Sequence, residues 1–380
     1  MRIGIEAQRV FRRNKHGMDY VVLQEIKELQ KIDTKNEYFV FVAPGVDRCL
    51  HDTPNVHIIE IGESFYPVWE QITLPKAAKK LNLDMLHCTS NTAPIFCDIP
   101  LILTLHDIIF LEPRDKNNKS IYQNMGWLYR RKVVPKILDK CLRIITVSNF
   151  EKQNIINKLN IPEARMAMIY NGYNEWFKPL RDVADIYKSY IDKPGYFFFL
   201  GNTDPKKNTE RTLIAYSRYL EKSNIKRKLL MADLDKTYLE GIIERNKIEN
   251  IRSQIVMPGY IVNSDLPYIY NNAFAFLYTS LRESFGIPLL EAMACGTPVI
   301  TSNTSSMPEI GGTDAILINP ESSEEIAEKM LLLENNEEYY NMQKEIGVKR
   351  ASLFSWKHTA ERLLNLYENV YRELPNSNIS

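Results

Sequence analysis

Short apolar runs alternate with helical patterns along the whole chain. The runs of the first half are rich in Ile, Val, Leu and Phe without strict alternation, as expected of strands covered on both faces. Val22, Ile26 and Leu29 fall on one face of a helix between the first two runs. The predicted strands of this half are 2–7, 37–43, 56–61, 84–87, 101–106, 143–148 and 166–170.

The second half repeats this plan. The predicted strands are 196–200, 228–232, 255–258, 274–279, 298–301 and 315–319. The predicted helices are 209–222, 236–247, 263–272, 288–295, 322–334 and 336–351. Two successive β/α series indicate an α/β protein of two Rossmann-like parallel-sheet domains. The boundary between the domains is expected in the polar stretch 172–195. Ligands in such folds bind beyond the carboxyl ends of the strands, so we expect them in a cleft that the two domains face.

Composition narrows the function classes. The 380 residues are 44% hydrophobic and carry 48 Lys and Arg against 47 Asp and Glu, so no global field favours nucleic acid. Five cysteines without a C-x-x-C pair indicate neither a disulfide framework nor a zinc ribbon. The start MRIGIEAQRV has no signal-peptide pattern, and no apolar run is long enough to span a bilayer. A cytoplasmic location is expected.

The segment with the richest chemistry is 278–300 (YTSLRESFGIPLLEAMACGTPVI). It reads as strand, loop, helix and strand, with Pro288 at the first helical position and Gly296 just past the last. A helix start has free N–H groups and a favourable dipole, which together bind anions. The expected diphosphate site uses the N–H groups of Leu289, Leu290 and Glu291.

Two glutamates flank this expected diphosphate site. A carboxylate accepts two hydroxyl hydrogen bonds at once, so it suits a vicinal diol. Glu283 could hold hydroxyls of a sugar and Glu291 those of a ribose. The alternative is that Glu283 caps the helix and Glu291 is a solvated residue on its face.

A second strand, loop and helix unit is 200–208 (LGNTDPKKN), with Gly201 in the loop and Lys206 and Lys207 at the start of the helix. A lysine there can contact a phosphate as a point charge. The alternative is that both lysines are only solvated.

The segment 278–300 resembles the E-x7-E signature of the retaining glycosyltransferases of family 4, which have the GT-B fold. The resemblance extends to Gly259 and Tyr260, and covers nearly the whole chain. It departs at Ser284, where glycine is commonest, and at Lys206, where the family has arginine. Further landmarks are WEQ at 69–71, LP at 74–75, VSNF at 147–150, NG at 171–172, SSMPE at 305–309 and FSW at 354–356.

This resemblance implies roles for individual residues. Lys207 matches the phosphate lysine, His106 matches a histidine beside the donor sugar, and Gly17 matches the glycine loop after the first strand. The implied catalytic residues are His106, Lys207 and Glu283. The implied donor site comprises Gly17, Gly201, Lys206, Lys207, Gly259, Tyr260, Glu283, Ser284, Phe285, Gly286, Ile287, Leu289, Leu290 and Glu291. The alternatives are that His106 is a hydrogen-bonded histidine of the core or its rim, and that Gly17 is a plain turn glycine.

The implied domains are an acceptor domain at 1–172, a linker and donor domain at 173–355, and a C-terminal helix at 356–380 that crosses back to the first domain. The expected reaction moves a hexose from a nucleotide-diphosphate sugar to a glycan or lipid-linked acceptor in cell-surface polysaccharide synthesis. It retains the anomeric configuration and uses neither metal nor resident cofactor. GDP-mannose is the first guess for the donor, followed by UDP-sugars. The alternatives are a nucleotide-sugar epimerase and a non-catalytic binding module.

Three other sequence features concern a metal ion, a nicotinamide cofactor and a membrane as possible partners. Asp233 and Asp235 form a D-x-D triplet, but no third acidic ligand is near it, so metal binding is not favoured. No G-x-G-x-x-G follows the first strand, so a nicotinamide enzyme is unsupported. The stretch 114–140 holds eight Lys and Arg against two Asp, with aromatic residues among them. It predicts either peripheral docking on an anionic membrane or a solvated helix face.

Overall fold

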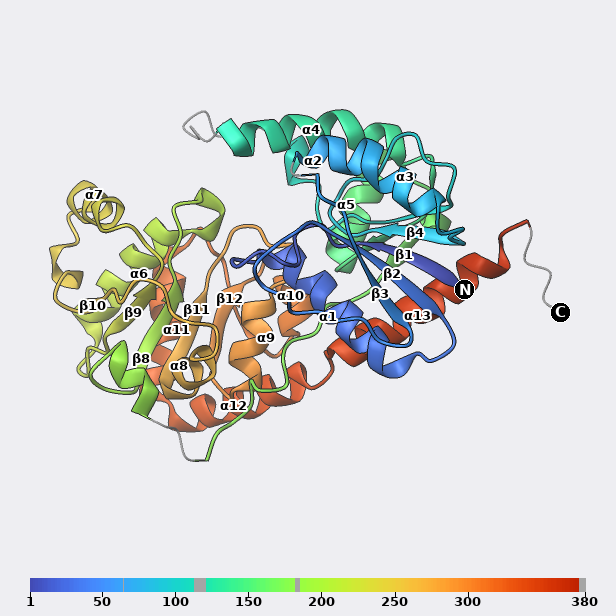
Figure 1. Ribbon diagram of the computed structural model, residues 1–380. Helices are drawn as coiled ribbons and strands as arrows, with labels where there is room; N and C mark the ends of the chain where they lie inside the picture. The colour runs from blue at the N-terminus through green and yellow to red at the C-terminus, as the bar shows by residue number, and fades with distance from the viewer. Residues whose placement is uncertain (64, 113–120, 182–184, 376–380) are drawn as a thin grey trace. The chain divides into compact units, whose positions relative to one another are not determined.

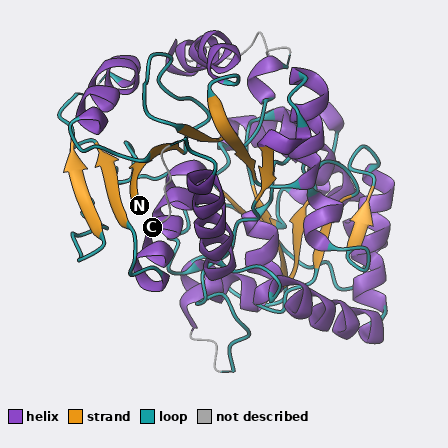
Figure 2. Ribbon diagram, turned by 90° about the vertical axis from the view of Figure 1, so that its right-hand side faces the viewer, coloured by secondary structure: helices purple, strands orange, loops and turns teal. Residues whose placement is uncertain are grey.

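The computed structural model describes residues 1–63, 65–112, 121–181 and 185–375 (Figure 1). The chain forms two compact units. Unit 1 comprises Met1–Gly172 and Trp356–Ser380, and unit 2 comprises Tyr173–Ser355. Each unit is a parallel sheet with helices packed on it, and Figure 2 shows the helices (purple) around the strands (orange). The two-domain α/β fold predicted from the sequence is therefore confirmed.

The sheet of unit 1 has seven parallel strands in the order β3-β2-β1-β4-β5-β6-β7. Their bounds are β1 Arg2–Glu6, β2 Glu37–Val42, β3 Val56–Glu60, β4 Met85–Cys88, β5 Leu101–Thr104, β6 Cys141–Thr146 and β7 Met166–Met168. The helices are α1 Gly17–Ile32, α2 Tyr66–Val68, the π-helix η1 Trp69–Thr73, α3 Leu74–Lys79, α4 Ile121–Ile137, α5 Asn149–Leu159 and α13 Trp356–Arg372. The order of strands reverses its direction between β1 and β4.

This sheet has a core on each face. Successive side chains of a strand point to opposite faces. Tyr38 and Val40 of β2 accordingly pack with α1 and α13, whereas Phe39 and Phe41 pack in the cluster that includes Trp69. Both faces of the strands are therefore apolar, which explains why the sequence shows continuous rather than alternating apolar runs.

The last helix belongs to unit 1, although it follows unit 2 in the sequence. Figure 1 shows α13 (red) alongside α1 (blue), and the two helices are in contact. The Tyr367 hydroxyl lies 2.7 Å from His87 Nδ1, and the Thr359 hydroxyl donates to the Tyr170 carbonyl at 2.7 Å. Burial lowers the pKa of His87 to about 3, so its imidazole is neutral between Tyr367 and Thr104.

The sheet of unit 2 has six parallel strands in the order β10-β9-β8-β11-β12-β13, and reverses direction between β8 and β11. Its strands are β8 Tyr196–Leu200, β9 Leu229–Ala232, β10 Ile255–Val256, β11 Ala273–Tyr278, β12 Val299–Ser302 and β13 Ile316–Ile318. Its α-helices are α6 Thr209–Lys222, α7 Lys236–Asn246, α8 Leu266–Asn272, α9 Ile287–Ala294, α10 Met307–Gly311, α11 Ser323–Asn335 and α12 Glu337–Ala351.

Five of the strands and helices predicted in the two β/α series have a boundary that is wrong by two residues or more. The strands predicted at 166–170 and 255–258 end two residues early, at Met168 and Val256. The strand predicted at 143–148 is β6, which begins at Cys141 and ends at Thr146, because Ser148 caps α5 by accepting the Glu151 N–H. The strand predicted at 101–106 ends at Thr104, so His106 lies in the loop that follows β5. The helix predicted at 263–272 begins at Leu266, after Asp265.

Glu25 makes the stability of unit 1 depend on pH. It lies on α1 and is 7% exposed, and burial raises its pKa from 4.5 to about 8. Between these values the folded protein keeps a proton that the unfolded chain releases, so rising pH destabilises the fold until about pH 8. We expect Glu25→Gln, which is neutral throughout, to raise the free energy of unfolding by about 4–5 kcal/mol at pH 8.5 and by less than about 1 kcal/mol at pH 5. Urea unfolding at both pH values measures this.

Glu28→Gln is the control, because Glu28 lies on the same helix beside Lys31. An equal gain for Glu25→Gln at both pH values would contradict a buried carboxyl that holds its proton.

Candidate functional site

Two loops of unit 2 meet where its strand order reverses. In open parallel sheets, this is the place where loops separate and ligands bind. The loop after β8 carries Lys206 and Lys207, and the loop after β11 carries Glu283. The Leu281 N–H donates to the Lys206 carbonyl at 2.7 Å, so the loops are joined through their backbones. Asn208 Nδ2 donates to the Thr279 carbonyl at 3.0 Å and adds a side-chain link.

Lys207 and Glu283 form an ion pair across these loops. Lys207 Nζ lies 2.5 Å from Glu283 Oε1, and the two side chains are 27% and 13% exposed. The same Nζ lies 5.7 Å from the centre of the Tyr278 ring. Burial, together with the Glu283 carboxylate beside it, raises the pKa of Tyr278, so this phenol stays protonated. The structure therefore brings the predicted lysine and the predicted sugar-binding glutamate into direct contact.

The Glu283 loop is held by two serines. The Glu283 N–H donates to Ser305 Oγ at 3.2 Å. Ser306 Oγ contacts the carbonyls of Glu283 at 3.0 Å and of Phe285 at 3.2 Å. Both serines lie in the SSMPE landmark, but its sequence alone does not reveal that they brace this loop. The loop is thus held in place by hydrogen bonds without any ligand.

The start of α9 differs from the prediction. Gly286 is the N-cap, with φ 104° and ψ 55°, and Pro288 occupies the second helical position. The Leu289 N–H donates to the Gly286 carbonyl at 3.1 Å, and Glu291 lies beyond the first turn, where N–H groups bond within the helix. The expectation of three available N–H groups is therefore wrong.

Glu291 is mostly buried rather than solvated. Burial raises its pKa to about 8, so at neutral pH it holds a proton. Tyr270 and Cys295 lie close enough for Glu291 to raise the pKa of each, after the larger effect of burial. A protonated carboxyl donates one hydrogen bond, accepts others, and does not repel a diphosphate. This explains how a second glutamate can lie beside an anion site.

The other predicted donor residues of unit 2 fall into two groups. Phe285, Leu289 and Leu290 have buried side chains, so these three can offer a ligand only their backbone. A Cβ on Gly201 would lie 2.8 Å from the Ala232 carbonyl oxygen, so packing between β8 and β9 explains this glycine. Lys206 lies 3.4 Å from Asp204, on the loop surface. The partly buried positions are Ser284 and Ile287, and the exposed ones are Gly259 and Tyr260.

His106 and Gly17 lie in unit 1, at loops that follow β5 and β1. His106 is 7% exposed, and its Nε2 lies 3.0 Å from the Thr89 carbonyl. Because a carbonyl only accepts, Nε2 carries the hydrogen and Nδ1 is the acceptor. Burial lowers the pKa of His106, so the ring is neutral. The Asn91 side chain fixes the position of the backbone by accepting the His106 N–H at 2.7 Å.

Gly17 is exposed at the start of α1, and a Cβ there would meet no atom within 4 Å. Packing therefore gives no reason for this glycine.

The described residues contain no group of three or more His, Cys, Asp or Glu that could hold a metal ion. Nor does any described helix combine the length and the apolar character needed to cross a bilayer.

Comparisons with known proteins agree with this arrangement. Residues 16–176 match the family described as Glycosyltransferase Family 4, and residues 185–350 match the family described as glycosyl transferases group 1. The protein is a family 4 glycosyltransferase. This glycosyltransferase is 28% identical to O-antigen chain mannosyltransferase B of Escherichia coli over 274 residues, 70% of each chain. It is 29% identical to the serotype-specific mannosyltransferase WbdA of the same species over 69% of this chain, but spans only a third of WbdA.

Solved structures show the GT-B fold for the glycosyltransferase. Sucrose-phosphate synthase of Thermosynechococcus elongatus superposes with a TM-score of 0.73 at 18% identity, over 98% of this chain and all of that one. Anabaena HepE in complex with UDP-glucose gives 0.72 at 17% identity, over 97% of this chain and all of HepE. At these identities the likeness concerns the fold alone.

Substitution of Gly286 tests whether the backbone conformation at the N-cap of α9 contributes to the stability of the protein. A Cβ at this position would lie 2.8 Å from Met307 Cε, and the backbone conformation is one that side chains disfavour. We expect Gly286→Ala to lower the free energy of unfolding by about 2 kcal/mol, measured by urea denaturation. Gly241→Ala is the control: Gly241 lies within α7 with no atom near its Cβ, so alanine should stabilise by about 0.5–1 kcal/mol. Equal effects of the two substitutions would contradict this account.

Proposed function

We propose that the protein transfers a hexose from a nucleotide-diphosphate sugar to a glycan or lipid-linked acceptor in cell-surface polysaccharide synthesis. The observation that carries this proposal is the contact between Lys207 and Glu283 where the strand order reverses. Mannose is the first choice for the sugar, because the two curated relatives described above are named mannosyltransferases. GDP-mannose is therefore the first donor to test, followed by UDP-sugars.

In the proposed reaction, the bond between the anomeric carbon and the diphosphate breaks. The sugar passes through an oxocarbenium-like state while negative charge develops on the leaving diphosphate. Lys207 and the start of α9 stabilise that charge, and Lys206 adds a more exposed cation. Glu283 accepts hydrogen bonds from sugar hydroxyls, and His106 Nδ1 accepts one more. The acceptor oxygen bonds to the anomeric carbon on the face that the diphosphate leaves, and its proton passes to the departing phosphate oxygen. The configuration is therefore retained without a metal.

Lys207 is expected to contribute far more than Lys206. We expect Lys207→Ala to lower kcat by about 100-fold or more, because it removes the cation closest to the charge that develops. Lys206→Ala should lower kcat by about tenfold or less, because Lys206 is 35% exposed, lies beside Asp204 and does not contact Glu283. The assay follows product formation from GDP-mannose and UDP-sugars by NMR, which also reports the anomeric configuration of the first product.

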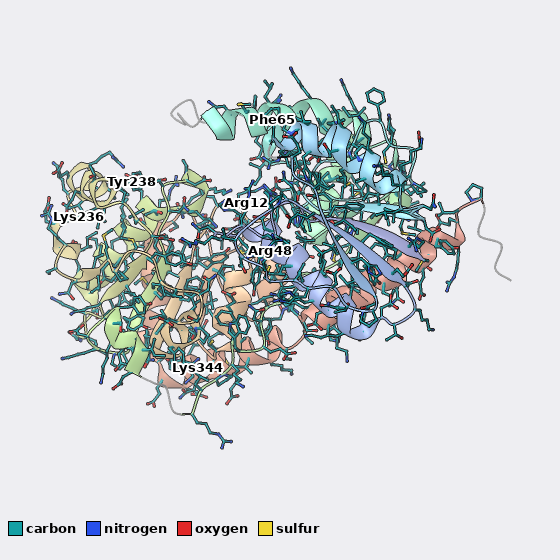
Figure 3. The ribbon with its side chains drawn as sticks, in the orientation of Figure 1. Arg12, Arg48, Phe65, Lys236, Tyr238 and Lys344 are labelled. Atoms are coloured by element: carbon teal, nitrogen blue, oxygen red, sulfur yellow. The ribbon has the colours of Figure 1, made fainter. Side chains whose placement is uncertain are left out.

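Lys344→Ala is the control for this series, because Lys344 is an exposed lysine of α12 (Figure 3). Inversion in the first-formed product would refute the same-face mechanism. Formation of an isomeric nucleotide-sugar without any acceptor would instead favour an epimerase, and nucleotide binding without turnover would favour a binding module.

We also propose that α4 docks on an anionic membrane. The predicted basic stretch begins at Arg114, but Arg114, Lys116 and Lys119 lie outside the described residues. Within α4, Met125 and Leu128 are 52% and 47% exposed, and helical spacing places both on the face that carries Lys132 and Lys136. Apolar side chains flanked by exposed lysines suit the boundary between lipid headgroups and acyl chains. This position would bring the enzyme to a lipid-linked acceptor.

Vesicle co-sedimentation tests the docking of α4. We expect Met125→Ser combined with Leu128→Ser to weaken binding to vesicles containing phosphatidylglycerol about fivefold or more. The control is Met342→Ser, because Met342 is 44% exposed on α12 of unit 2. Binding that does not depend on the anionic lipid content would remove this proposal.

A further inference from the structure

The two carboxylates of the D-x-D triplet, Asp233 and Asp235, have different surroundings in unit 2. Asp235 is the N-cap of α7, and its Oδ1 accepts the Tyr238 N–H at 2.8 Å. Figure 3 shows Lys236 and Tyr238 on this helix. The Asp233 side chain is exposed, and within the described residues it has neither a hydrogen bond nor an ion pair. Only Asp233 is therefore available to a ligand.

The backbone of Asp233 is held in an unusual conformation. Its φ is 58°, in the left-handed region that few residues adopt. Its N–H donates to the Gly259 carbonyl at 3.1 Å. One strand further along, the Gly201 N–H donates to the Ala232 carbonyl at 2.9 Å. The loops that follow β8, β9 and β10 are thus joined in a row, and Asp233 lies in the middle of it.

An exposed aromatic ring lies on the next loop of this row. Tyr260 follows Gly259 and is 64% exposed. Its loop is braced, because the Tyr190 hydroxyl donates to Asp265 Oδ2 at 2.7 Å and the Asp265 N–H donates to the Val262 carbonyl at 2.9 Å. An exposed tyrosine on a fixed loop provides a face on which any nucleobase can stack.

This row can accommodate a nucleoside whose phosphates lie at Lys207. Neighbouring strands are about 4.8 Å apart, so Asp233 lies roughly one strand spacing from the loop of Lys207, and Tyr260 roughly two. Glu291 lies on α9, which contacts α8, the helix that follows the Tyr260 loop. A ribose bound by Glu291 would therefore lie on the side of the site where this row of loops is found.

We propose that Asp233 reads the base of the donor and selects guanine, with Tyr260 stacking on it; this rests on the proposed nucleotide-sugar function. Guanine presents two neighbouring donors, N1–H and the 2-amino group, and the two oxygens of one carboxylate accept both. Uracil presents a single N–H between two carbonyl oxygens, which a carboxylate repels. The Asp233 carboxylate therefore favours guanine through attraction and disfavours uracil through repulsion.

Calorimetric titration of the full chain with GDP and with UDP tests the inference. We expect the wild type to bind GDP at least tenfold more tightly than UDP. Asp233→Asn keeps the size of the side chain and tolerates the left-handed backbone. It should weaken GDP binding about tenfold and leave UDP within about twofold. Tyr260→Ala should weaken both nucleotides, because stacking does not distinguish bases.

Asp235→Asn is the matched control, because it removes the same charge two residues away while an amide oxygen still caps α7. It should leave both affinities within about twofold. Equal weakening of GDP and UDP by Asp233→Asn, or a wild type that prefers UDP, would overturn guanine selection while leaving the nucleotide-sugar function in place. Binding of neither nucleotide by the wild type would overturn the proposed function and this inference together.

Discussion

The ion pair between Lys207 and Glu283 is the interaction on which the candidate site depends. The two residues are 76 positions apart in the sequence, and meet because β8 and β11 are neighbours in the sheet. Each charge is neutralised by the other, so the site needs no ligand to be stable. In the proposed reaction a diphosphate competes for the lysine and leaves the carboxylate to the sugar hydroxyls. In that proposal, one pair couples recognition of the leaving group to recognition of the transferred group.

Burial gives the carboxyl groups of this protein different properties. Glu283 has Lys207 as a partner, whereas burial without a described cationic partner raises the pKa of Glu291 and Glu25 to about 8. In Glu291 this makes a hydrogen-bond donor beside the proposed diphosphate site, and in Glu25 it links the stability of unit 1 to pH. The same residue type therefore serves as an anion or as a neutral acid, depending on its surroundings.

The sequence predicted the strands well, because buried parallel strands are short apolar runs that few other elements imitate. It located the residues of the Lys207 and Glu283 loops for the same reason, since both follow such strands. It could not predict features that depend on tertiary neighbours. The Thr89 carbonyl that fixes the His106 tautomer, the Gly286 carbonyl that takes the Leu289 N–H, and the burial of Glu291 all depend on backbone paths that residue types do not specify.

The return of α13 to unit 1 affects how the molecule can be divided. The chain passes from unit 1 to unit 2 at Tyr173 and back at Trp356, so two backbone connections join the units. Proteolytic cleavage at one of them would leave the fragments covalently attached through the other. A fragment of residues 1–172 would lack α13 and expose the apolar surface formed by Ile26, Tyr38 and Val40 to water. An isolated first domain would therefore need residues 356–375 supplied through a fused linker or as a separate peptide.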